Sequence, residues 1–533
     1  MPTRPDASSS LAGTARTTGA CIARIARAGR TARTARNAAL AAGFLVVATT
    51  ACAPPEAGTP GQTSGEAREM GLGELATTAQ AENQVARFGD ALLDDIGARV
   101  SALESGQAAQ DWVEAQFREF GLSNVRQESF DLLGWDRDRA EITVLESTAE
   151  VGGPLRILSL GHVGSDAVEA ELLNAGYGTA EEIAALGDAV RGRIVVVDVS
   201  SPPGYGRGVH RTEKVTLATE AGAVGFIQVN NREGDLVPIG VATMGDVPTE
   251  IPAVAADLAT GDRLREALEA GPVRVRLEVE NWMERSTAAN VLGDIPGRTD
   301  EVIVVGGHLD SWDLAQGAVD NGSGSMAVIE AARALAAHVE RTGVQPLRTI
   351  RFALWMGEEL GLYGSRAYVA DRLPGGILAE DGIERHVATL NLDVVGAPVG
   401  LGAMGRTEGH TLLGAIRDAL VDAGFDLEEE ISTGGGLYSD HQPFIMEGVP
   451  VVTVRSRQRP EAAGVSHTTA DVRDVIDEEG IAASAAVSSA LLWALANVQP
   501  FPFRHWSETE TGEKLEALGV RDPLERAGEW RWR

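Results

Sequence analysis

The sequence predicts an α/β protein in which a mostly parallel sheet is sandwiched by helices, with a second, β-rich domain inserted. Two observations support this fold class. Over residues 286–499, short apolar β-branched runs alternate with Ala-rich helical stretches, the pattern of parallel strands joined by helices. Over residues 152–285, β runs alternate instead with Gly- and Pro-rich turns, which indicates a separate, smaller domain.

Length and charge agree with a soluble protein of several domains. The chain has 533 residues, which is more than one ordinary hydrophobic core accommodates. Its apolar fraction of 44% and charged fraction of 23% are typical of globular proteins. The net charge of −31 repels a phosphate backbone, so nucleic acid is not expected as a partner.

Residues 1–52 have the composition of an export signal. An arginine-rich region precedes an apolar run at 38–47, and small residues then lead into Cys52. This ending resembles a bacterial lipobox, which implies a lipid on Cys52 as the protein's one membrane contact. Thr49 stands where leucine is usual, so plain cleavage near Ala51 is the alternative. Either route predicts an extracytoplasmic protein, and because the other cysteine lies in the removed signal, no disulfide is expected.

Composition and periodicity divide the remaining chain into five segments. A Pro-, Gly-, Ser- and Thr-rich linker precedes the first helices and strands of the α/β domain; the insert, the main α/β part and a charged tail follow. We place the tail at the periphery and assign it no function. The expected bounds are 53–75 for the linker, 76–151 for the first part of the α/β domain, 152–285 for the insert, 286–499 for the main part and 500–533 for the tail.

One uncharged run could be mistaken for a membrane span. Residues 481–498 are long enough to approach the thickness of a bilayer, but they consist mainly of Ala and Ser, which gain little in hydrocarbon. A packed C-terminal helix is the expected structure.

Polar side chains follow the apolar strands of the main part, where ligands bind in open α/β sheets. These side chains are His308 and Asp310 in GGHLDSWD, Asp320 in GAVDNGSG, Glu358 and Glu359 in MGEELG, Asp393 in LNLDVVG, and His467 in GVSHTTAD. On extended backbone, positions two apart share a face, so we expect Asp310 to support His308 from behind.

Taken together, these groups suit a metal site. An adjacent Glu-Glu pair is usually only a solvated helix start, and a lone loop histidine usually lies on the surface. Asp393 is a carboxylate within an apolar strand, and such a group is costly to bury unless it is paired or bound to metal. Two histidines and three carboxylates suit two zinc ions that share one carboxylate. A further glutamate beside a ligand can then act as general base.

The order of these motifs resembles peptidase family M28, the co-catalytic zinc peptidases. The resemblance rests on HLD, then DNGSG, Glu-Glu, an aspartate-ended strand, SDHQPF and a late histidine. The motif HLDSWD and the spacing between His308 and Asp320 most resemble those of the carboxypeptidase Q (plasma glutamate carboxypeptidase) branch. GRIVVVDV, LATEAGAVGFIQV and EIPAVAAD resemble the protease-associated domain. The resemblance implies a phosphorylase/hydrolase-like catalytic domain with a lid insert.

The resemblance also implies roles for these residues. His308 and Asp393 would ligate one zinc, Glu359 and His467 the other, and Asp320 would bridge the two ions. Glu358 would be the general base, with Asp310 assisting behind the ligands. The implied substrates are short peptides, and a homodimer is implied as well. Carboxylate and imidazole ligands also accept Mn or Co, so zinc is a preference.

Several interpretations stay open at this stage. The activity could be that of an aminopeptidase, a dipeptidase or a carboxypeptidase; related folds include single-zinc glutaminyl cyclases, and a non-catalytic peptide-binding lipoprotein is a further alternative. Ser439, Asp440 and His441 are adjacent and so cannot easily form a triad. With Tyr438, they are instead expected near the substrate. The remaining histidines are interpreted as ordinary polar residues (His162, His210) or as helix or loop surface (His338, His386, His410, His505).

Overall fold

The computed structural model describes residues 70–234 and 236–533, all within one compact unit. The export signal with Cys52 and residues 53–69 of the predicted linker lie outside the described residues. The last residues of the predicted linker differ from the expectation, because helix α2 already begins at Leu72. Four residues of this helix are buried, so its packing explains the earlier start: Leu72, Leu75, Ala76 and Ala79.

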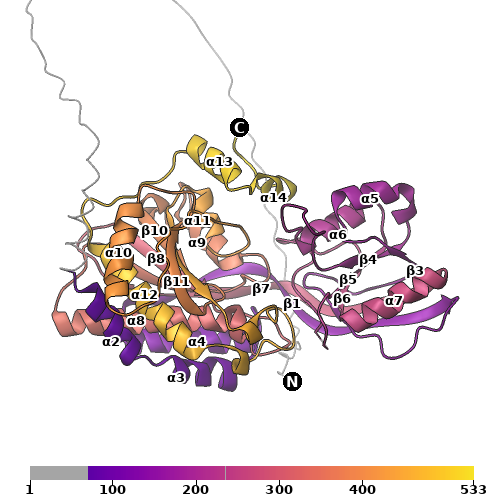
Figure 1. The fold of residues 1–533 in the computed structure, drawn as a ribbon, viewed down its shortest axis with the longest axis horizontal. Helices are drawn as coiled ribbons and strands as arrows, with labels where there is room; N and C mark the ends of the chain where they lie inside the picture. Colours follow the sequence, from indigo (N-terminus) through magenta and orange to yellow (C-terminus); the bar gives the residue numbers. More distant parts are fainter. Residues whose placement is uncertain (1–69, 235) are drawn as a thin grey trace, which may run out of the picture. The chain divides into compact units, whose positions relative to one another are not determined.

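A twelve-stranded sheet runs through the described chain in the order β11-β12-β10-β8-β9-β7-β3-β4-β5-β6-β2, with β1 paired to β7 (Figure 1). The four strands β12, β10, β8 and β9 are mutually parallel. The strands are β1 Ser123–Ser147, β2 Ile157–Ser159, β3 Asp166–Asn174, β4 Ile194–Asp198, β5 Gly225–Val229, β6 Ala253–Ala256, β7 Val273–Ile295, β8 Val302–His308, β9 Thr349–Trp355, β10 His386–Asn391, β11 Ala397–Ala403 and β12 Val451–Arg457.

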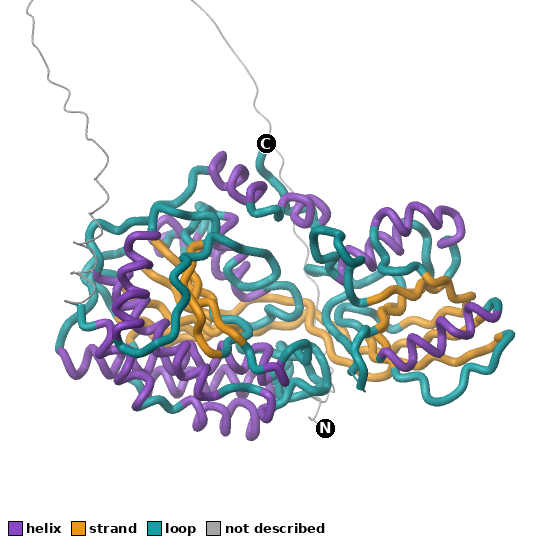
Figure 2. The backbone as a smooth tube through the Cα atoms, viewed as in Figure 1, coloured by secondary structure: helices purple, strands orange, loops and turns teal. Residues whose placement is uncertain are grey.

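Helices cover both faces of the part of this sheet that contains β7, β8 and β9, as Figure 2 shows. Helices α8 and α12 pack on β8 and β9, whereas α9 packs on β7 with α11 beside it. The helices are α2 Leu72–Ala81, α3 Val85–Gly89, α4 Glu104–Glu119, α5 Ala180–Leu186, α6 Arg211–Glu220, α7 Leu258–Ala270, α8 Ser323–Thr342, α9 Tyr363–Arg372, α10 His410–Asp422, α11 Gln442–Met446, α12 Glu478–Asn497, α13 Glu508–Ala517 and α14 Arg521–Arg526. Short 3-10 or π turns are η1 Asp90–Ile96, η2 Gly187–Val190, η3 Ala318–Gly322, η4 Ala379–Asp381, η5 Ile383–Arg385, η6 Pro460–Ala462 and η7 Arg473–Val475.

The predicted α/β architecture with a β-rich insert is confirmed. The Val- and Ile-rich runs form the buried parallel strands, and the uncharged run forms α12, which is long and apolar enough to cross a membrane but lies 89% buried inside the fold. Small side chains let α8 and α12 approach closely, since nearly all of the first three turns of α8 is buried.

The insert has its own core and remains joined to the catalytic sheet. Strands β3 to β6 are covered by α5, α6 and α7, and their apolar side chains form a separate cluster. The link is β7, which pairs with β9 at one end and with β3 at the other. Its partner β1 is continuous over 25 residues.

The C-terminal tail is not peripheral, contrary to the expectation. Trp506 and Trp532 are buried, and they join Leu515 and Leu524 in an apolar cluster with Val451 of the sheet. The tail therefore belongs to the catalytic body, because the burial of two indole rings stabilises its attachment substantially.

Two of the histidines assigned to the surface are buried. His386 lies in β10 and is hydrogen-bonded to the Tyr368 hydroxyl at 2.7 Å. His338 packs edge-on against Trp493 at 4.6 Å between ring centroids. Both serve packing, since neither lies near the groups that could hold metal.

Candidate metal centre

The polar clusters meet because they follow four neighbouring parallel strands. Strand β8 leads to His308, β9 to Glu358 and Glu359, β10 to Asp393, and β12 to His467. The carboxyl ends of parallel strands lie at one edge of the sheet, so side chains far apart in sequence converge there. Asp320 joins them from η3, the irregular turn that opens α8.

The carboxylate of Asp320 stands between two imidazoles. Its Oδ1 lies 3.1 Å from His308 Nε2, and its Oδ2 lies 3.1 Å from His467 Nε2. Asp393 Oδ1 is 3.4 Å from His308 Nε2, and Glu359 Oε2 is 3.1 Å from His467 Nε2. Each oxygen of Asp320 therefore faces its own pair of one histidine and one carboxylate.

Both histidines are oriented by backbone carbonyls. His308 Nδ1 donates to the Asp310 carbonyl at 3.1 Å, and His467 Nδ1 donates to the Ile239 carbonyl of the insert at 3.2 Å. A proton held on Nδ1 leaves Nε2 of each ring with a free lone pair directed into the cluster. The tautomers that this arrangement favours are those of metal-binding imidazoles.

The carboxylate of Asp310 lies behind His308, 3.6 Å from Nδ1, while the residue's own carbonyl oxygen is closer. The same carboxylate also accepts the backbone N–H groups of Glu358 at 3.2 Å and Glu359 at 3.4 Å, together with the Ser101 hydroxyl at 3.1 Å. Asp310 thus fixes the turn that carries the adjacent glutamates.

Three further side chains orient the acidic groups. The Trp312 indole N–H donates to Glu359 Oε2 at 2.6 Å, and the Ser439 hydroxyl donates to Asp393 Oδ2 at 2.6 Å. The Asp471 carboxylate accepts the N–H of Val319 at 2.6 Å and that of Asp320 at 3.1 Å. The bond to Asp393 leaves Oδ1 free toward His308. Glu359 instead shares Oε2 between Trp312 and His467 and keeps Oε1 without a hydrogen-bond partner among the described residues.

Arg99 holds the loop between β8 and η3 through carbonyl groups. Its guanidinium donates to the carbonyls of Leu309 at 2.7 Å, Gln316 at 2.6 Å and Gly317 at 2.8 Å. Burial lowers the pKa of Arg99 to about 10, while the charge of Asp471 opposes this shift. Both ends of the loop that separates His308 from Asp320 are therefore tied to one rigid cation.

The centre concentrates negative charge in an enclosed space. Burial, with repulsion from Glu359, Asp440 and Asp393, raises the pKa of Glu358 well above its usual value, although the nearby His308 opposes this. Burial lowers the pKa of His308, but Glu358 and Asp393 outweigh it and raise the pKa well above the ordinary value. Five carboxylates lie at this centre: Asp320, Glu358, Glu359, Asp393 and Asp440.

These residues fit metal ions. Donor atoms of His308, Asp320 and Glu359 all lie within 4.8 Å of one another, which is close enough for these groups to bind metal together. Glu359 Oε1 and Asp393 Oδ1 are buried without a hydrogen-bond partner among the described residues. Such orphaned oxygens are costly unless a cation meets them. Histidine and carboxylate donors without any thiolate suit zinc.

A cavity of about 260 Å³ opens over the centre, and the insert supplies part of its wall. His210 of the insert stacks on Tyr438 of the catalytic domain, with 4.4 Å between ring centroids and 11° between planes. Arg211 lines the same cavity, and its Nε donates to the Val241 carbonyl at 2.8 Å. His210 is therefore a wall of the site and not merely an ordinary polar residue.

The structure brings together all seven residues that the sequence singled out, and it adds four. His308, Asp310, Asp320, Glu358, Glu359, Asp393 and His467 lie in one cluster. Sequence reasoning missed Arg99, Arg211, Trp312 and Asp471. Asp471 and Trp312 carried a signal, since they lie in the quoted stretches GVSHTTAD and GGHLDSWD. Of the SDH residues, Ser439 supports Asp393, and Asp440 is buried nearby without a partner for either oxygen among the described residues.

Comparison with known families agrees with this geometry. Residues 290–492 match the model of peptidase family M28, and residues 163–264 match that of the PA domain. Carboxypeptidase Q of Mus musculus is 25% identical over 418 residues, which cover 76% of this chain and 84% of that protein. Leupeptin-inactivating enzyme 1 of Streptomyces exfoliatus is 32% identical over 234 residues, or 41% of this chain and 50% of that enzyme.

Solved structures share the fold. A peptidase M28 precursor from Shewanella amazonensis superposes with a TM-score of 0.69 at 24% identity, covering 84% of this chain and 100% of that one. An aminopeptidase from Aneurinibacillus gives a TM-score of 0.59 at 23% identity over 81% of this chain and 98% of its own. Both matches extend over the catalytic part and beyond it, since they cover more of the chain than residues 290–492.

The Asp471→Asn variant tests how the backbone of Asp320 is held. An amide side chain offers one acceptor and turns its NH₂ group toward a backbone N–H, so the η3 turn loses one of its two bonds to residue 471. We expect zinc affinity to fall by about 10–100-fold, as for other groups that orient ligands. Competition with a chelator measures this affinity, and Asp474→Asn, at an exposed position three residues on, is the matched control. Equal affinities in both variants would contradict the role of Asp471.

Proposed function

We propose that the chain is a metallo-exopeptidase of peptidase family M28, and that it is an exported dizinc enzyme that hydrolyses short peptides. The observation that carries the two-ion proposal is the position of Asp320. Its two oxygens face two separate histidine–carboxylate pairs at equal distances of 3.1 Å. A single ion would leave one of these pairs unused, whereas two ions bridged by Asp320 use every donor.

In this proposal His308 and Asp393 hold one zinc, Glu359 and His467 hold the other, and Asp320 bridges both. When bound, the ions supply Lewis acidity, which makes a water molecule acidic and polarises a peptide carbonyl. The remaining chemistry belongs to the protein. Glu358 lies on the cavity wall without being a ligand, so its carboxylate can accept the proton of the attacking water and return it to the leaving amine.

The surroundings of Glu358 support that role. Its backbone N–H is held by Asp310 at 3.2 Å, which fixes where the side chain starts. The side chain is partly exposed and faces the cavity, while Glu359 beside it is buried and fixed by Trp312. Two adjacent glutamates thereby take different tasks: Glu358 faces the cavity, where it can exchange a proton, and Glu359 is fixed in place to bind an ion.

Arg211 favours substrates with a free carboxylate. Its Nη groups have no ion pair or hydrogen bond in the part of the chain that the structure describes, although it lines the cavity over the metal centre. Burial lowers the pKa of Arg211 to about 10, so it remains a cation at neutral pH. Its guanidinium lies against Gly240, where a Cβ atom would meet Nη2 at 1.6 Å. An enclosed guanidinium without a partner suits the two oxygens of a carboxylate.

The position of Arg211 discriminates among the exopeptidase activities. A dipeptidase or a carboxypeptidase must bind the terminal carboxylate of the residue that leaves, whereas an aminopeptidase has no such need. We therefore favour dipeptide hydrolysis or carboxypeptidase-type cleavage of short peptides, with aminopeptidase activity as the alternative. A purely peptide-binding lipoprotein fits less well, because it has no need of a general base beside a complete ligand set.

Export of the protein is part of the proposal. The composition of residues 1–52 supports an extracytoplasmic location with a lipid on Cys52, or secretion after plain cleavage. An enzyme in that location encounters peptides from outside the cell.

The Glu358→Gln variant separates metal binding from catalysis. Glutamine keeps the shape of the side chain but cannot accept the proton, so we expect two zinc ions per chain and turnover reduced by about 10²–10⁴-fold. Metal analysis and dipeptide hydrolysis are measured on one preparation, with and without a chelator. The control is Glu380→Gln, an exposed position in η4. Normal hydrolysis by Glu358→Gln would refute the mechanism, and one zinc per chain in the unaltered protein would refute the dizinc centre.

The Arg211→Met variant tests recognition of the carboxylate. Removing the guanidinium should raise KM for dipeptides with a free C-terminus by about tenfold or more, because a charge-assisted pair is lost. Hydrolysis of the same dipeptides as C-terminal amides should change little. Arg191→Met, at an exposed position of the insert, is the control. An equal loss of activity on the free dipeptides and on their C-terminal amides would show that Arg211 acts only on the fold or on the metal centre.

The Cys52→Ser variant tests the lipid anchor. In a bacterial host, the unaltered chain should sediment with membranes and partition into detergent, whereas the variant should be released in soluble form. Fractionation followed by mass analysis of the N-terminal peptide measures both outcomes. An unaltered chain that is already soluble and begins near residue 52 would establish plain cleavage.

A further inference from the structure

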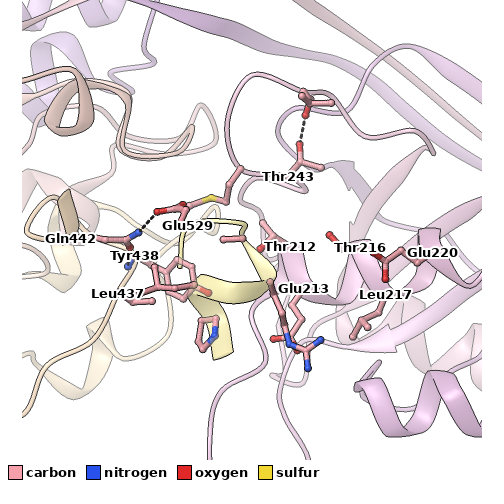
Figure 3. A pocket seen from close by; sticks show the side chains of 16 residues that line it. Thr212, Glu213, Thr216, Leu217, Glu220, Thr243, Leu437, Tyr438, Gln442 and Glu529 are labelled. Carbon is pink, nitrogen blue, oxygen red and sulfur yellow. Dashed lines mark hydrogen bonds and ion pairs between the residues drawn. The ribbon is translucent and has the colours of Figure 1, made fainter. Parts of the chain in front are cut away.

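A second cavity adjoins the one over the metal centre. Its volume is about 340 Å³, and Met244 and Tyr438 line both cavities. Figure 3 shows its side chains arriving from helix α6 and a loop of the insert, from the catalytic loop around Tyr438, and from the C-terminal segment. A substrate bound at the metal centre thus has a neighbouring space to fill.

Helix α6 connects the two cavities. Its first residue, Arg211, lines the metal cavity, and Thr212, Thr216 and Glu220 line the second one. Residues four apart lie on one face of a helix, so the last three form a continuous strip about 12 Å long that leads away from Arg211. Glu220 stands at its far end.

Most of the charge on this cavity is already neutralised. Glu213 is held by Arg207 at 2.8 Å and by Arg526 of α14 at 3.1 Å, and Glu529 is held by Arg366 at 2.9 Å. Glu220 is exposed and has no ion pair or hydrogen bond within the described chain. It is therefore the one lining carboxylate whose charge is free to attract a cationic ligand.

The space between Arg211 and Glu220 has apolar and hydroxyl-bearing walls. Leu217, Val247 and Leu437 line it together with the Thr216 hydroxyl. Such walls suit an aliphatic stem that ends in a charged head. A lysine or arginine side chain that starts near Arg211 and the Glu220 side chain that points back toward it are together long enough to span the strip.

We propose that this second cavity binds the side chain of the C-terminal, leaving amino acid of the substrate and selects a basic one. The inference rests on the proposed function: Arg211 takes the terminal carboxylate, the side chain of that residue runs along Thr212 and Thr216, and its ammonium or guanidinium group meets Glu220. An acidic side chain in this place would meet an unneutralised carboxylate and is disfavoured.

The C-terminal segment is thereby a determinant of specificity. Pro523, Leu524 and Ala527 form the wall opposite α6, and Leu524 anchors this wall because it is only 1% exposed. The ion pair between Arg526 and Glu213 ties that wall to the insert at 3.1 Å. The cavity is complete only while the tail, the insert and the catalytic loop are all in place.

The test compares three dipeptides, Ala-Lys, Ala-Glu and Ala-Ala, on the zinc-loaded, full-length enzyme. We expect kcat/KM for Ala-Lys to exceed that for Ala-Glu by about tenfold or more, as a charge-assisted contact provides. In Glu220→Lys the ratio of Ala-Lys to Ala-Glu should fall at least tenfold, with Ala-Ala unchanged within about twofold. Glu269→Lys makes the same charge change at an exposed position of α7 in the same domain and should leave the ratio unaltered.

The outcomes separate this inference from the proposed function. If the unaltered enzyme cleaves Ala-Ala but Glu220→Lys leaves the ratio unchanged, the peptidase stands and the second cavity is not the side-chain site. Calorimetric binding of Ala-Lys and Ala-Glu to the Glu358→Gln variant gives a readout independent of turnover, and equal affinities there would also refute the inference.

Discussion

The centre depends on one constraint, which is that the carboxylate of Asp320 must lie between two imidazoles with one oxygen toward each. Asp320 belongs to an irregular turn at the start of α8, so no regular hydrogen-bond ladder fixes its position. Three groups do so instead: Arg99 holds the carbonyls before the turn, Asp471 holds its N–H groups, and Asn321 accepts the N–H groups of Gly324 and Val394. Buried charged and polar side chains replace secondary structure at this point, which makes the turn rigid where regular backbone could not present the carboxylate.

This constraint has an electrostatic consequence. Five carboxylates share an enclosed space with two histidines, and four of the carboxylate oxygens, on Glu359, Asp393 and Asp440, have no hydrogen-bond partner among the described residues. Such an arrangement is unfavourable unless cations enter, since isolated buried charges cost far more than hydrogen bonds return. The four parallel strands supply the rigidity that keeps these groups together despite their repulsion. The fold therefore assembles a site whose stability depends on the bound ions of the proposed mechanism, and the histidine tautomers favoured by the carbonyls of Asp310 and Ile239 prepare it for them.

The extent to which the sequence predicted this structure differs between the centre and its surroundings. Most groups of the centre closely follow an apolar strand or lie at the start of a helix, so local patterns indicated the fold class and a metal site, and the family resemblance implied the ligand set. His467 is the exception, since it lies in a loop beyond the end of β12 at Arg457. Arg99 could not be found in this way, because it acts through backbone carbonyls of a loop more than 200 residues away in sequence. The same holds for the tail, which its charged composition placed at the periphery, because the packing of Trp506 and Trp532 with Val451 of the sheet depends on distant parts of the chain. His386 and His338 were misassigned because burial depends on tertiary neighbours that a lone histidine in a polar context does not reveal.

Chemistry and specificity are thus encoded in different parts of the chain. The reacting groups follow strands of one domain, whereas Arg211 and the helix that carries it belong to the insert, and the opposite wall of the second cavity belongs to the tail. These parts are not independent of the centre, since the carbonyl of Ile239 in the insert orients His467. A displacement of the insert would withdraw Arg211 and Glu220 from a substrate and at the same time release one metal-facing histidine. Under the proposed function, substrate selection and the integrity of the centre are therefore coupled through the two hydrogen bonds between Ile239 and His467. For that reason the insert is better regarded as part of the active site than as a cover over it.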